Sequence, residues 1–389
     1  MTMTATSTVP PILSVSALGA AADDRRAELE SGRRIPPDLY EQALRAGLFR
    51  QLVAPDLGGD GAPPGAWFRT GMELARHEAS LAWVVTQGAA ELGWIAAGGD
   101  PSWAADVLAD PLGCSASSVA GLGELVVDGA RSRFHGRWAF NTGCQGATWI
   151  GGLALVAGTG GSSGRPEVRW GWVPAARARI VEDWDSSGMR GTGSHTTVID
   201  EQEIDTAWTF DPKAPTTNDR GAHRCLVGNG NWPIAAAVAA VQLGNARRAL
   251  DEARAVIGAK APPPDFVRLA DNAAVQRALV EAEGFVQAGT ATMEQELDAM
   301  WAEASVRHEL TAATRVRLHR AALTADLLAV RAVEAACSMT GTASTVRGHV
   351  LGRCRRDAEA LHAHVSVNGM AAEHNAKVDL GAVERSILV

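Results

Sequence analysis

The feature that most constrains this chain is a helical pattern that fills most of its second half. The pattern occurs in four stretches, at residues 235–257, 266–304, 306–339 and 353–365. Three consecutive prolines from Pro262 separate the first two stretches, and Gly341 ends the third. Helices of this length must bury an apolar stripe against one another, so we predict a four-helix bundle.

Two segments of different character precede the predicted bundle. Before residue 112, apolar residues such as Leu39 and Ala43 recur on one helical face. Between residues 124 and 210, stretches typical of strands alternate with clusters of Gly, Ser and Asp. These stretches are residues 131–140, 149–157, 167–173 and 195–199, and residues 158–164 are predicted to form a hairpin tip or mobile loop.

The order of these patterns predicts an α+β fold. A tail at residues 1–22 is expected to be disordered. An N-terminal helical domain then covers residues 23–112, a central β domain covers 113–221, and the four-helix bundle covers 222–389. The sequence has no internal repeat and no βαβ alternation, so a Rossmann sheet is not expected.

Composition limits the partners and the compartment. The chain has 389 residues, a net charge of −8 and a pI near 5.7, which argue against nucleic acid or an anionic membrane as a partner. Its five cysteines are scattered without a CxxC pair, as expected for reduced thiols rather than a disulfide framework or a zinc site. There is no signal-peptide pattern and no apolar stretch of about 18 residues, so we expect a cytoplasmic protein.

Three short motifs occur in a fixed order. They are GRWAFNTG at residues 136–143, GMRGTGS at residues 188–194 after Trp184, and RCRRD at residues 353–357 with His364 seven residues beyond its aspartate. In this order they resemble the acyl-CoA dehydrogenase superfamily, and more narrowly its two-component, reduced-flavin-dependent monooxygenase branch. The resemblance covers roughly residues 36–364, which is nearly the whole chain.

The resemblance implies a fold and an activity. The fold has an N-terminal helical domain, a central β domain and a C-terminal four-helix bundle, commonly assembled as a homotetramer. The activity is that of a hydroxylase component, which receives reduced FMN or FAD from a separate NAD(P)H:flavin reductase. With O₂ it forms a C4a-hydroperoxyflavin and hydroxylates an aromatic, indolic or polycyclic small molecule, with an amino-sugar nitrogen as a lesser alternative.

Two motif residues are candidates for catalysis. Thr142 ends a strand pattern beside Gly143, so its hydroxyl can approach a planar ligand and donate to a ring nitrogen. The resemblance places this hydroxyl at the flavin N5 edge, and it gives His364 the role of a base or of a hydrogen-bond partner of the peroxide. The ordinary alternatives are a threonine that caps its own turn and a structural histidine. His362 lies on another helix face than His364, which is poor geometry for a metal, and no metal site is predicted.

Other cofactor contacts are implied by the resemblance. Ser117 and Ser118 match a flavin-contacting loop, and Trp138 belongs to the first motif. Lys260 stands where relatives often have an arginine that pairs with a flavin phosphate, although lysine lacks the bidentate geometry. Loop serines are common, and a tryptophan such as Trp138 is more often part of a core than of a pocket.

Two glycine-containing segments have competing interpretations. Gly341 and Thr342 belong to a turn that resembles a cofactor contact made across a subunit interface, and a simple helix C-cap is an equal alternative. Residues 188–194 could cradle a phosphate, but a strand pattern rather than a helix follows them. We therefore interpret residues 188–194 as a structural crossover within the β domain.

Two other functions remain open. An acyl-CoA dehydrogenase needs a carboxylate base. The positions where relatives supply this base fall in residues 228–233 and 365–369, which contain no acid, and Glu252 and Glu373 lie outside the expected context. This counts against dehydrogenation. A binding or dehydratase-like protein that has lost redox chemistry is the third possibility.

Overall fold

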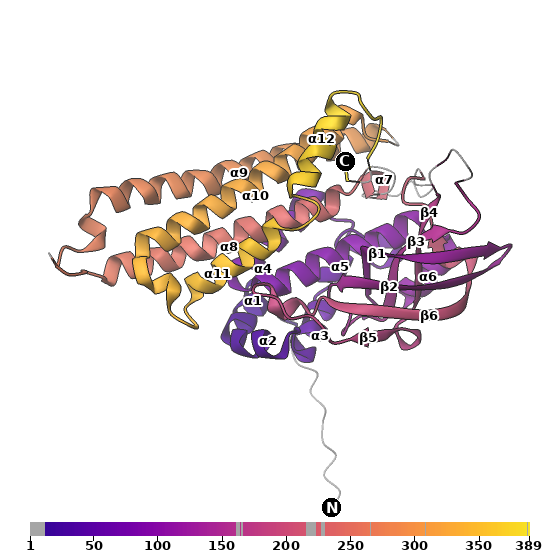
Figure 1. Ribbon diagram of the computed structural model, residues 1–389, viewed down its shortest axis with the longest axis horizontal. Helices are drawn as coiled ribbons and strands as arrows, with labels where there is room; N and C mark the ends of the chain where they lie inside the picture. The colour runs from indigo at the N-terminus through magenta and orange to yellow at the C-terminus, as the bar shows by residue number, and fades with distance from the viewer. Residues whose placement is uncertain are drawn as a thin grey trace, which may run out of the picture.

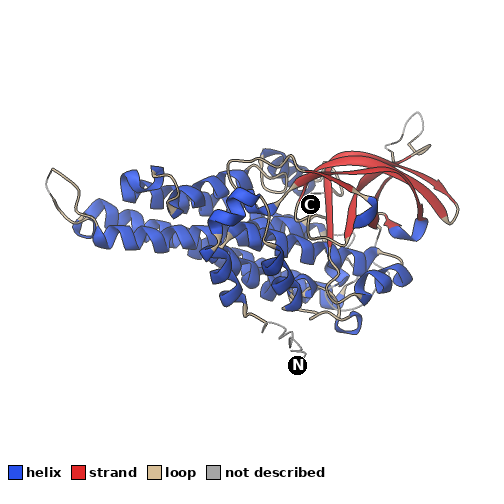
Figure 2. Ribbon diagram, turned by 90° about the horizontal axis from the view of Figure 1, so that it is seen from below, coloured by secondary structure: helices blue, strands red, loops and turns tan. Residues whose placement is uncertain are grey.

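The computed structural model describes residues 12–160, 164, 166–214, 223–226, 230–264, 266–307, 309–386 and 388–389. Figure 1 shows the long helices of the C-terminal half at one end, the sheet at the other, and α4 and α5 between them. In Figure 2 the sheet curves over one end of the helices. The expected α+β architecture, with helices before a β domain and a helical bundle after it, is confirmed.

Six helices form the N-terminal part. They are α1 (Val15–Asp24), α2 (Arg26–Gly32), α3 (Pro37–Arg45), α4 (Pro64–His77), α5 (Ala79–Gly98) and α6 (Pro101–Ala109). Proline begins α3, α4 and α6, because its fixed φ suits the first helical turn and its missing N–H is not needed there. Short 3₁₀ helices occur along the chain at Leu48–Arg50, Pro55–Leu57, Ala175–Arg177, Arg190–Thr192, Thr206–Trp208, Leu269–Asp271 and Gly341–Thr345.

The predicted disordered tail is wrong for its second half. Helix α1 begins at Val15, where the Ser14 hydroxyl caps it by accepting from the Ala17 N–H. Leu18 and Ala22 are fully buried in the main core, which orders this segment. Residues 1–11 lie outside the described part of the chain.

The β domain is one seven-stranded sheet in the order β5-β6-β2-β1-β3-β4-β7. Its strands are β1 (Ser115–Asp128), β2 (Arg131–Asn141), β3 (Trp149–Val156), β4 (Val168–Pro174), β5 (Arg179–Val181), β6 (His195–Asp205) and β7 (Thr209–Phe210). The predicted hairpin tip joins the antiparallel pair β3 and β4, and residues 161–163 within it lie outside the described residues. Strand β1 begins at Ser115, so Ser117 and Ser118 lie in a strand and not in the expected loop.

Four helices form the predicted bundle. They are α8 (Trp232–Ala259), α9 (Ala273–Val306), α10 (Ala312–Thr340) and α11 (Val350–His362), with α10 packed against the other three. A short α7 (His223–Leu226) precedes them, and α12 (Gly369–Asp379), which the sequence did not predict, follows and packs on α10.

The second and third motifs meet in space and connect the β domain to the bundle. The Met189 N–H donates to Asp357 Oδ1 at 2.6 Å. A Cβ at Gly188 would lie 2.1 Å from the Arg356 carbonyl oxygen, so only glycine allows this approach. Residues 188–194 therefore form a crossover between β5 and β6, in agreement with the structural interpretation.

Candidate active site

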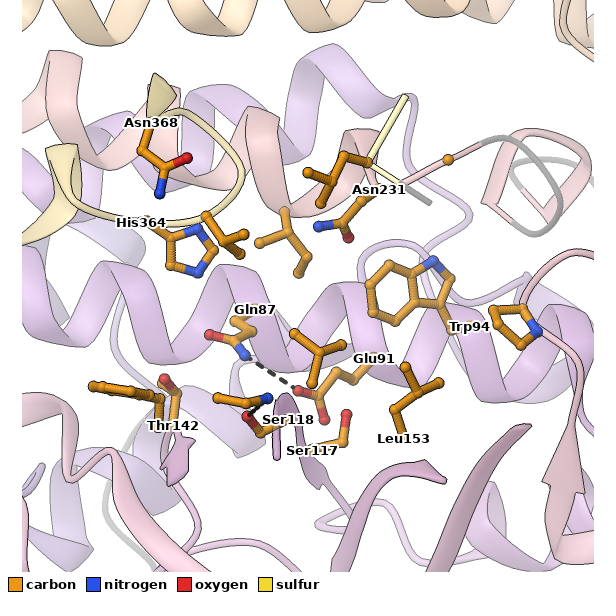
Figure 3. Close-up of a pocket in the computed structure, with 18 of the residues that line it drawn as sticks. Gln87, Glu91, Trp94, Ser117, Ser118, Thr142, Leu153, Asn231, His364 and Asn368 are labelled. Carbon is orange, nitrogen blue, oxygen red and sulfur yellow. Dashed lines mark hydrogen bonds between the residues drawn. The ribbon is translucent and has the colours of Figure 1, made fainter. Parts of the chain in front are cut away.

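A cavity of about 800 Å³ lies where α5, the sheet, the start of α8 and the segment after α11 meet. Helix α5 contributes Trp83, Gln87, Glu91 and Trp94, which share one face because they are four, four and three residues apart. Figure 3 shows Gln87 and Glu91 between Thr142 on the sheet side and His364 on the bundle side. Most of the remaining lining is apolar, including Leu153, Trp170, Phe210, Leu226 and Ile234.

Thr142 belongs to a directed chain of hydrogen bonds. The Trp83 Nε1–H donates to Thr142 Oγ1 at 3.1 Å, and Thr142 Oγ1 lies 2.9 Å from Ser194 Oγ. Ser194 Oγ lies 2.7 Å from Thr192 Oγ1, whose proton goes to the Met189 carbonyl oxygen at 2.9 Å. Each hydroxyl has one proton, so Ser194 must donate to Thr192 and Thr142 must donate to Ser194. Thr142 thus keeps one lone pair for a ligand, and its proton is not free for the expected donation to a ring nitrogen.

His364 is held as a neutral imidazole. The Ser366 backbone N–H donates to His364 Nδ1 at 3.2 Å, which places the ring proton on Nε2. Its ring packs edge-on against Trp83, with centroids 5.2 Å apart. Burial lowers the pKa of His364 to about 4, because the apolar surroundings disfavour the imidazolium. This state favours hydrogen-bond donation over the role of a base.

Glu91 is a polar group of the cavity that the sequence reasoning missed. Its side chain is buried, and burial raises its pKa to about 8. Oε1 accepts from Gln87 Nε2 at 3.4 Å and Oε2 accepts from Ser115 Oγ at 3.2 Å. The available signal was that Glu91 is the single charged residue in α5, a helix of 20 residues that is otherwise nearly all apolar or small.

The cavity's polar atoms suit a flavin. Gln87 Oε1 is buried with no hydrogen-bond partner among the described residues, and Ser117 Oγ beside Glu91 has no well-formed bond within them. Thr142 adds a free lone pair, while Phe140 and Trp184 add an apolar edge with their rings 5.9 Å apart. Buried, unpaired acceptors and donors cost free energy unless a ligand satisfies them.

The predicted site residues fall into two groups. Thr142, His364, Ser117 and Ser118 all line the cavity. The Ser118 hydroxyl is already committed, since it donates to the Ala139 carbonyl oxygen at 2.6 Å and accepts from the Ala120 N–H at 3.0 Å.

Trp138 does not reach the cavity. Its ring is fully buried in the core of the β domain, and its Nε1–H donates to the Leu153 carbonyl oxygen at 2.9 Å. A Cβ at Gly152 would lie 2.2 Å from this ring, which explains why glycine stands there. The expected cofactor contact of Trp138 therefore conflicts with its position.

Lys260, Gly341 and Thr342 lie at the far end of the bundle. Helix α8 separates Lys260 from the cavity by 28 residues, about 40 Å at the helical rise. Lys260 Nζ donates to the Thr340 carbonyl oxygen at 3.0 Å, and Lys260 and Gly341 line a separate cavity of about 560 Å³. Within one chain these residues cannot share a ligand with Thr142.

His362 points elsewhere than His364, as its spacing predicted. Its Nδ1 lies 2.6 Å from Asp326 Oδ2, and Gln242 Nε2 donates to the other oxygen of Asp326 at 2.7 Å. Across the described residues no cluster of His, Cys, Asp and Glu has the arrangement of a metal site. The helices described also include none with the length and apolar character needed to span a bilayer.

The chain is similar to known proteins over most of its length. Residues 236–369 match the family described as acyl-CoA dehydrogenase, C-terminal domain. The indole-3-acetate monooxygenase of Pseudomonas putida is 24% identical over 87% of this chain and 86% of its own. The FADH(2)-dependent resorcinol hydroxylase, oxygenase component, of Rhizobium sp. (strain MTP-10005) is 27% identical over 93% of this chain and 92% of its own.

Solved structures agree with these relatives. The 3-HSA hydroxylase from Rhodococcus sp. RHA1 superposes with a TM-score of 0.85 over 96% of this chain and 98% of its own, at 23% identity. XiaF from Streptomyces sp., in complex with FADH2 and glycerol, superposes with a TM-score of 0.84 over 95% and 94%, at 21% identity. Residues 236–369 are therefore similar to the acyl-CoA dehydrogenase C-terminal domain, the chain is similar over most of its length to monooxygenases and to an oxygenase component that depends on reduced flavin, and its fold is that of the 3-HSA hydroxylase.

Proposed function

We propose that the protein is the oxygenase component of a two-component monooxygenase and hydroxylates an aromatic, indolic or polycyclic small molecule. Reduced FMN or FAD, supplied by a separate reductase, is its cofactor and O₂ its co-substrate. The observation that carries this proposal is that Thr142 and His364 both line one largely apolar cavity, on different sides of it. They come from distant parts of the chain, and both belong to segments that resemble the monooxygenase branch.

The reduced flavin, when bound, supplies the two electrons that activate O₂ and the route by which one oxygen atom reaches the substrate. The chain's task is to hold the reactants and exclude water. Trp94, Leu153, Trp170 and Phe210 surround the cavity with apolar surface, which disfavours the entry of water and unproductive release of peroxide.

Thr142 is proposed to position the cofactor. Its proton is committed to Ser194, so its remaining lone pair accepts a hydrogen bond from a ring N–H. The chain from Trp83 through Thr142 to Met189 fixes the direction of this lone pair, because every proton in it has an assigned acceptor. A fixed acceptor costs little reorganisation when the ligand binds.

His364 is proposed to act as a hydrogen-bond donor. Nδ1 accepts from the Ser366 N–H, and no hydrogen bond from Nε2–H to another described residue is present, so this N–H can donate to a ligand. With a pKa near 4 the ring stays neutral at neutral pH. It can therefore polarise the reacting oxygen atom or orient a substrate hydroxyl without changing its charge.

A dehydrogenase remains the competing function because an acidic side chain lines the cavity. Among the described lining residues that side chain is Glu91, and it was not anticipated. A dehydrogenase base must be ionised before the reaction, whereas burial raises the pKa of Glu91 to about 8. Glu91 also lies on α5, away from the two positions where relatives supply the base.

The proposed cofactor contacts of Lys260, Gly341 and Thr342 require a second copy of the chain. About 40 Å separates them from the cavity within one subunit. In a homotetramer in which the far end of a neighbouring bundle lies beside each cavity, Lys260, Gly341 and Thr342 of one subunit contact the cofactor that binds beside Thr142 of another. We therefore include this assembly in the proposal.

The test is anaerobic stopped flow with the purified protein and reduced FMN or FAD, mixed with oxygenated buffer. A transient absorbance band in the violet that outlives the oxidation of free flavin supports the proposal. Oxidation at the rate of free flavin contradicts it. Reduction of oxidised flavin by an acyl-CoA, without O₂ activation, favours the dehydrogenase, and failure to bind flavin in either state favours the non-redox function.

A further inference from the structure

Glu91 is a buried carboxyl group that faces the cavity, and among the described residues it has no ion pair. Its side chain is 2% exposed, and the groups that bond to it there, Gln87, Ser115 and Ser117, are neutral. Ser115 is itself fixed, because its oxygen accepts from Trp172 Nε1 at 3.0 Å and its proton goes to Glu91. Figure 3 shows the Glu91 carboxyl at the cavity, with its bond to Gln87.

The titratable groups nearest Glu91 supply no positive charge near pH 7. Tyr40 and Cys114 are close enough to interact with it electrostatically. Burial raises the pKa of Tyr40 well above its usual value and that of Cys114 to about 11, so both are neutral near pH 7. His364 across the cavity is neutral as well, since its pKa is near 4.

The carboxyl group can still pair with a ligand. Gln87, Ser115 and Ser117 are its protein partners, and each oxygen of a carboxylate accepts about two hydrogen bonds. Because burial raises its pKa to about 8, the carboxyl is largely protonated near pH 7, and a protonated nitrogen in the cavity would favour its ionised form through a charge-assisted hydrogen bond. An anionic ligand group would gain no such pairing and would keep Glu91 protonated.

We propose that Glu91 determines substrate specificity and selects aromatic compounds that carry a protonated nitrogen over those that carry a carboxylate. This inference rests on the proposed function, because it names the substrate class of the same site. The relatives named for indole-3-acetate act, by that name, on an anionic compound, so the proposed preference differs from the substrate in their names.

Three cationic side chains also line the cavity among the described residues, namely Lys213, Arg315 and Arg385. Arg315 already donates to the carbonyl oxygens of Leu310 and Glu384, at 2.9 and 3.4 Å. Arg385 pairs with Glu309. The two arginines are engaged with protein groups, and all three cations offer the alternative that the test must exclude.

The experiment measures binding of three compounds with one ring system by isothermal titration calorimetry. Tryptamine is cationic, indole is neutral, and indole-3-propionate matches tryptamine in length but is anionic. We expect the wild-type protein to bind tryptamine at least about tenfold more tightly than indole-3-propionate. Glu91→Gln keeps the size and one acceptor oxygen but removes the ionisable group, so it should weaken tryptamine binding about tenfold and change indole binding less than about twofold.

Two further variants keep the test decisive. Glu91→Asp retains the charge and should retain the preference for tryptamine. Glu124→Gln removes an exposed carboxylate on β1 and should change none of the three affinities. A preference for indole-3-propionate, no tryptamine binding at millimolar concentration, or a tryptamine preference that survives Glu91→Gln would each overturn the proposal.

The outcome is independent of the flavin measurement. Binding of the three compounds needs no reduced flavin and no turnover. If Glu91→Gln loses the preference for tryptamine and the stopped-flow experiment shows no transient band, the specificity proposal holds and the monooxygenase proposal fails. The reverse result keeps the monooxygenase and removes Glu91 as its specificity residue.

Discussion

At the scale of single residues, the assignment of protons around Thr142 predicts how much this residue contributes to holding the reduced flavin. In Thr142→Val the Trp83 Nε1–H and Ser194 lose their partner, and the cavity loses a fixed acceptor. We expect the fraction of reduced flavin that ends as hydrogen peroxide to rise, with reoxidation about tenfold faster, equivalent to about 1.4 kcal/mol. Stopped-flow reoxidation and a peroxide assay measure both quantities.

Thr142→Ser is the matched control, because it keeps the hydroxyl and removes only the methyl group. It should behave nearly as the wild type. If Thr142→Val leaves the reoxidation rate and peroxide yield unchanged, Thr142 has no part in holding the cofactor.

The neutral state of His364 gives a prediction for pH dependence. Its pKa lies near 4, below the usual 6.5, so the ring is neutral above that value and gains a proton only as the pH falls towards 4. Hydroxylation should therefore show no titration of His364 between about pH 6 and 9. His364→Ala should lower turnover by about 100-fold or more while reduced flavin still binds.

Histidine NMR of the flavin-free protein measures the pKa directly, with His364→Gln used to assign the signal. Glutamine also offers an N–H and should recover part of the activity lost in His364→Ala. A midpoint above pH 6 for His364 would contradict the neutral-donor role and favour a base.

At the scale of elements, an ion pair anchors the helix that carries Trp83, Gln87, Glu91 and Trp94. Glu78 caps the start of α5 by accepting from the Leu81 N–H, and Arg353 of α11 pairs with it. Both side chains are largely buried. Arg353→Leu leaves the Glu78 carboxylate unpaired, so we expect a loss of about 3–5 kcal/mol in the free energy of unfolding.

Chemical denaturation monitored by tryptophan fluorescence measures this loss. Arg355→Leu is the control from the same motif, since Arg355 forms an exposed pair with Glu359 and should cost less than about 1 kcal/mol. Equal effects of the two substitutions would show that the buried pair is not a special connection between α5 and α11.

The approach of the crossover to α11 gives a second prediction for elements. A Cβ at Gly188 would overlap the Arg356 carbonyl oxygen, so Gly188→Ala should displace the crossover and lower stability by about 2 kcal/mol or more. In Gly258→Ala, near the end of α8, nothing lies within 4 Å of the new methyl group. This control should be neutral or slightly stabilising in thermal denaturation.

At the scale of the whole molecule, the separation of Lys260 from the cavity predicts complementation between subunits. Lys260→Glu and His364→Ala should each be inactive alone, the first through lost flavin binding. Co-expressed chains with different tags form mixed oligomers, and in random mixing about a quarter of the sites receive both intact halves. Activity of the mixed oligomers well above that of either variant is the expected result.

Absence of recovery in verified mixed oligomers would contradict a site shared between subunits. Full flavin affinity in the Lys260→Glu variant would also contradict a site shared between subunits. Each result would confine the cofactor to the cavity of one chain.

Local pattern was sufficient for most elements of the fold. The long helices were predictable because their apolar residues repeat at helical spacing over many turns, and prolines mark their limits. Strand β1 was missed, because the small polar residues Ser115, Ser117 and Ser118 of its first half carry little strand signal. Helix α1 was missed because its ordering depends on burial of Leu18 and Ala22 against distant segments.

The sequence by itself determined the resemblance to flavin-dependent monooxygenases, the order of helical and β segments, and Thr142 and His364 as candidates. These properties reside in local periodicity and in short motifs. Tertiary structure decided that Trp138 belongs to a core and that Lys260 lies far from Thr142. It also assigned the proton of Thr142 to Ser194, set the neutral state of His364 and brought Glu91 to the cavity. Protonation and pairing depend on burial and on groups distant along the chain, which no local pattern contains.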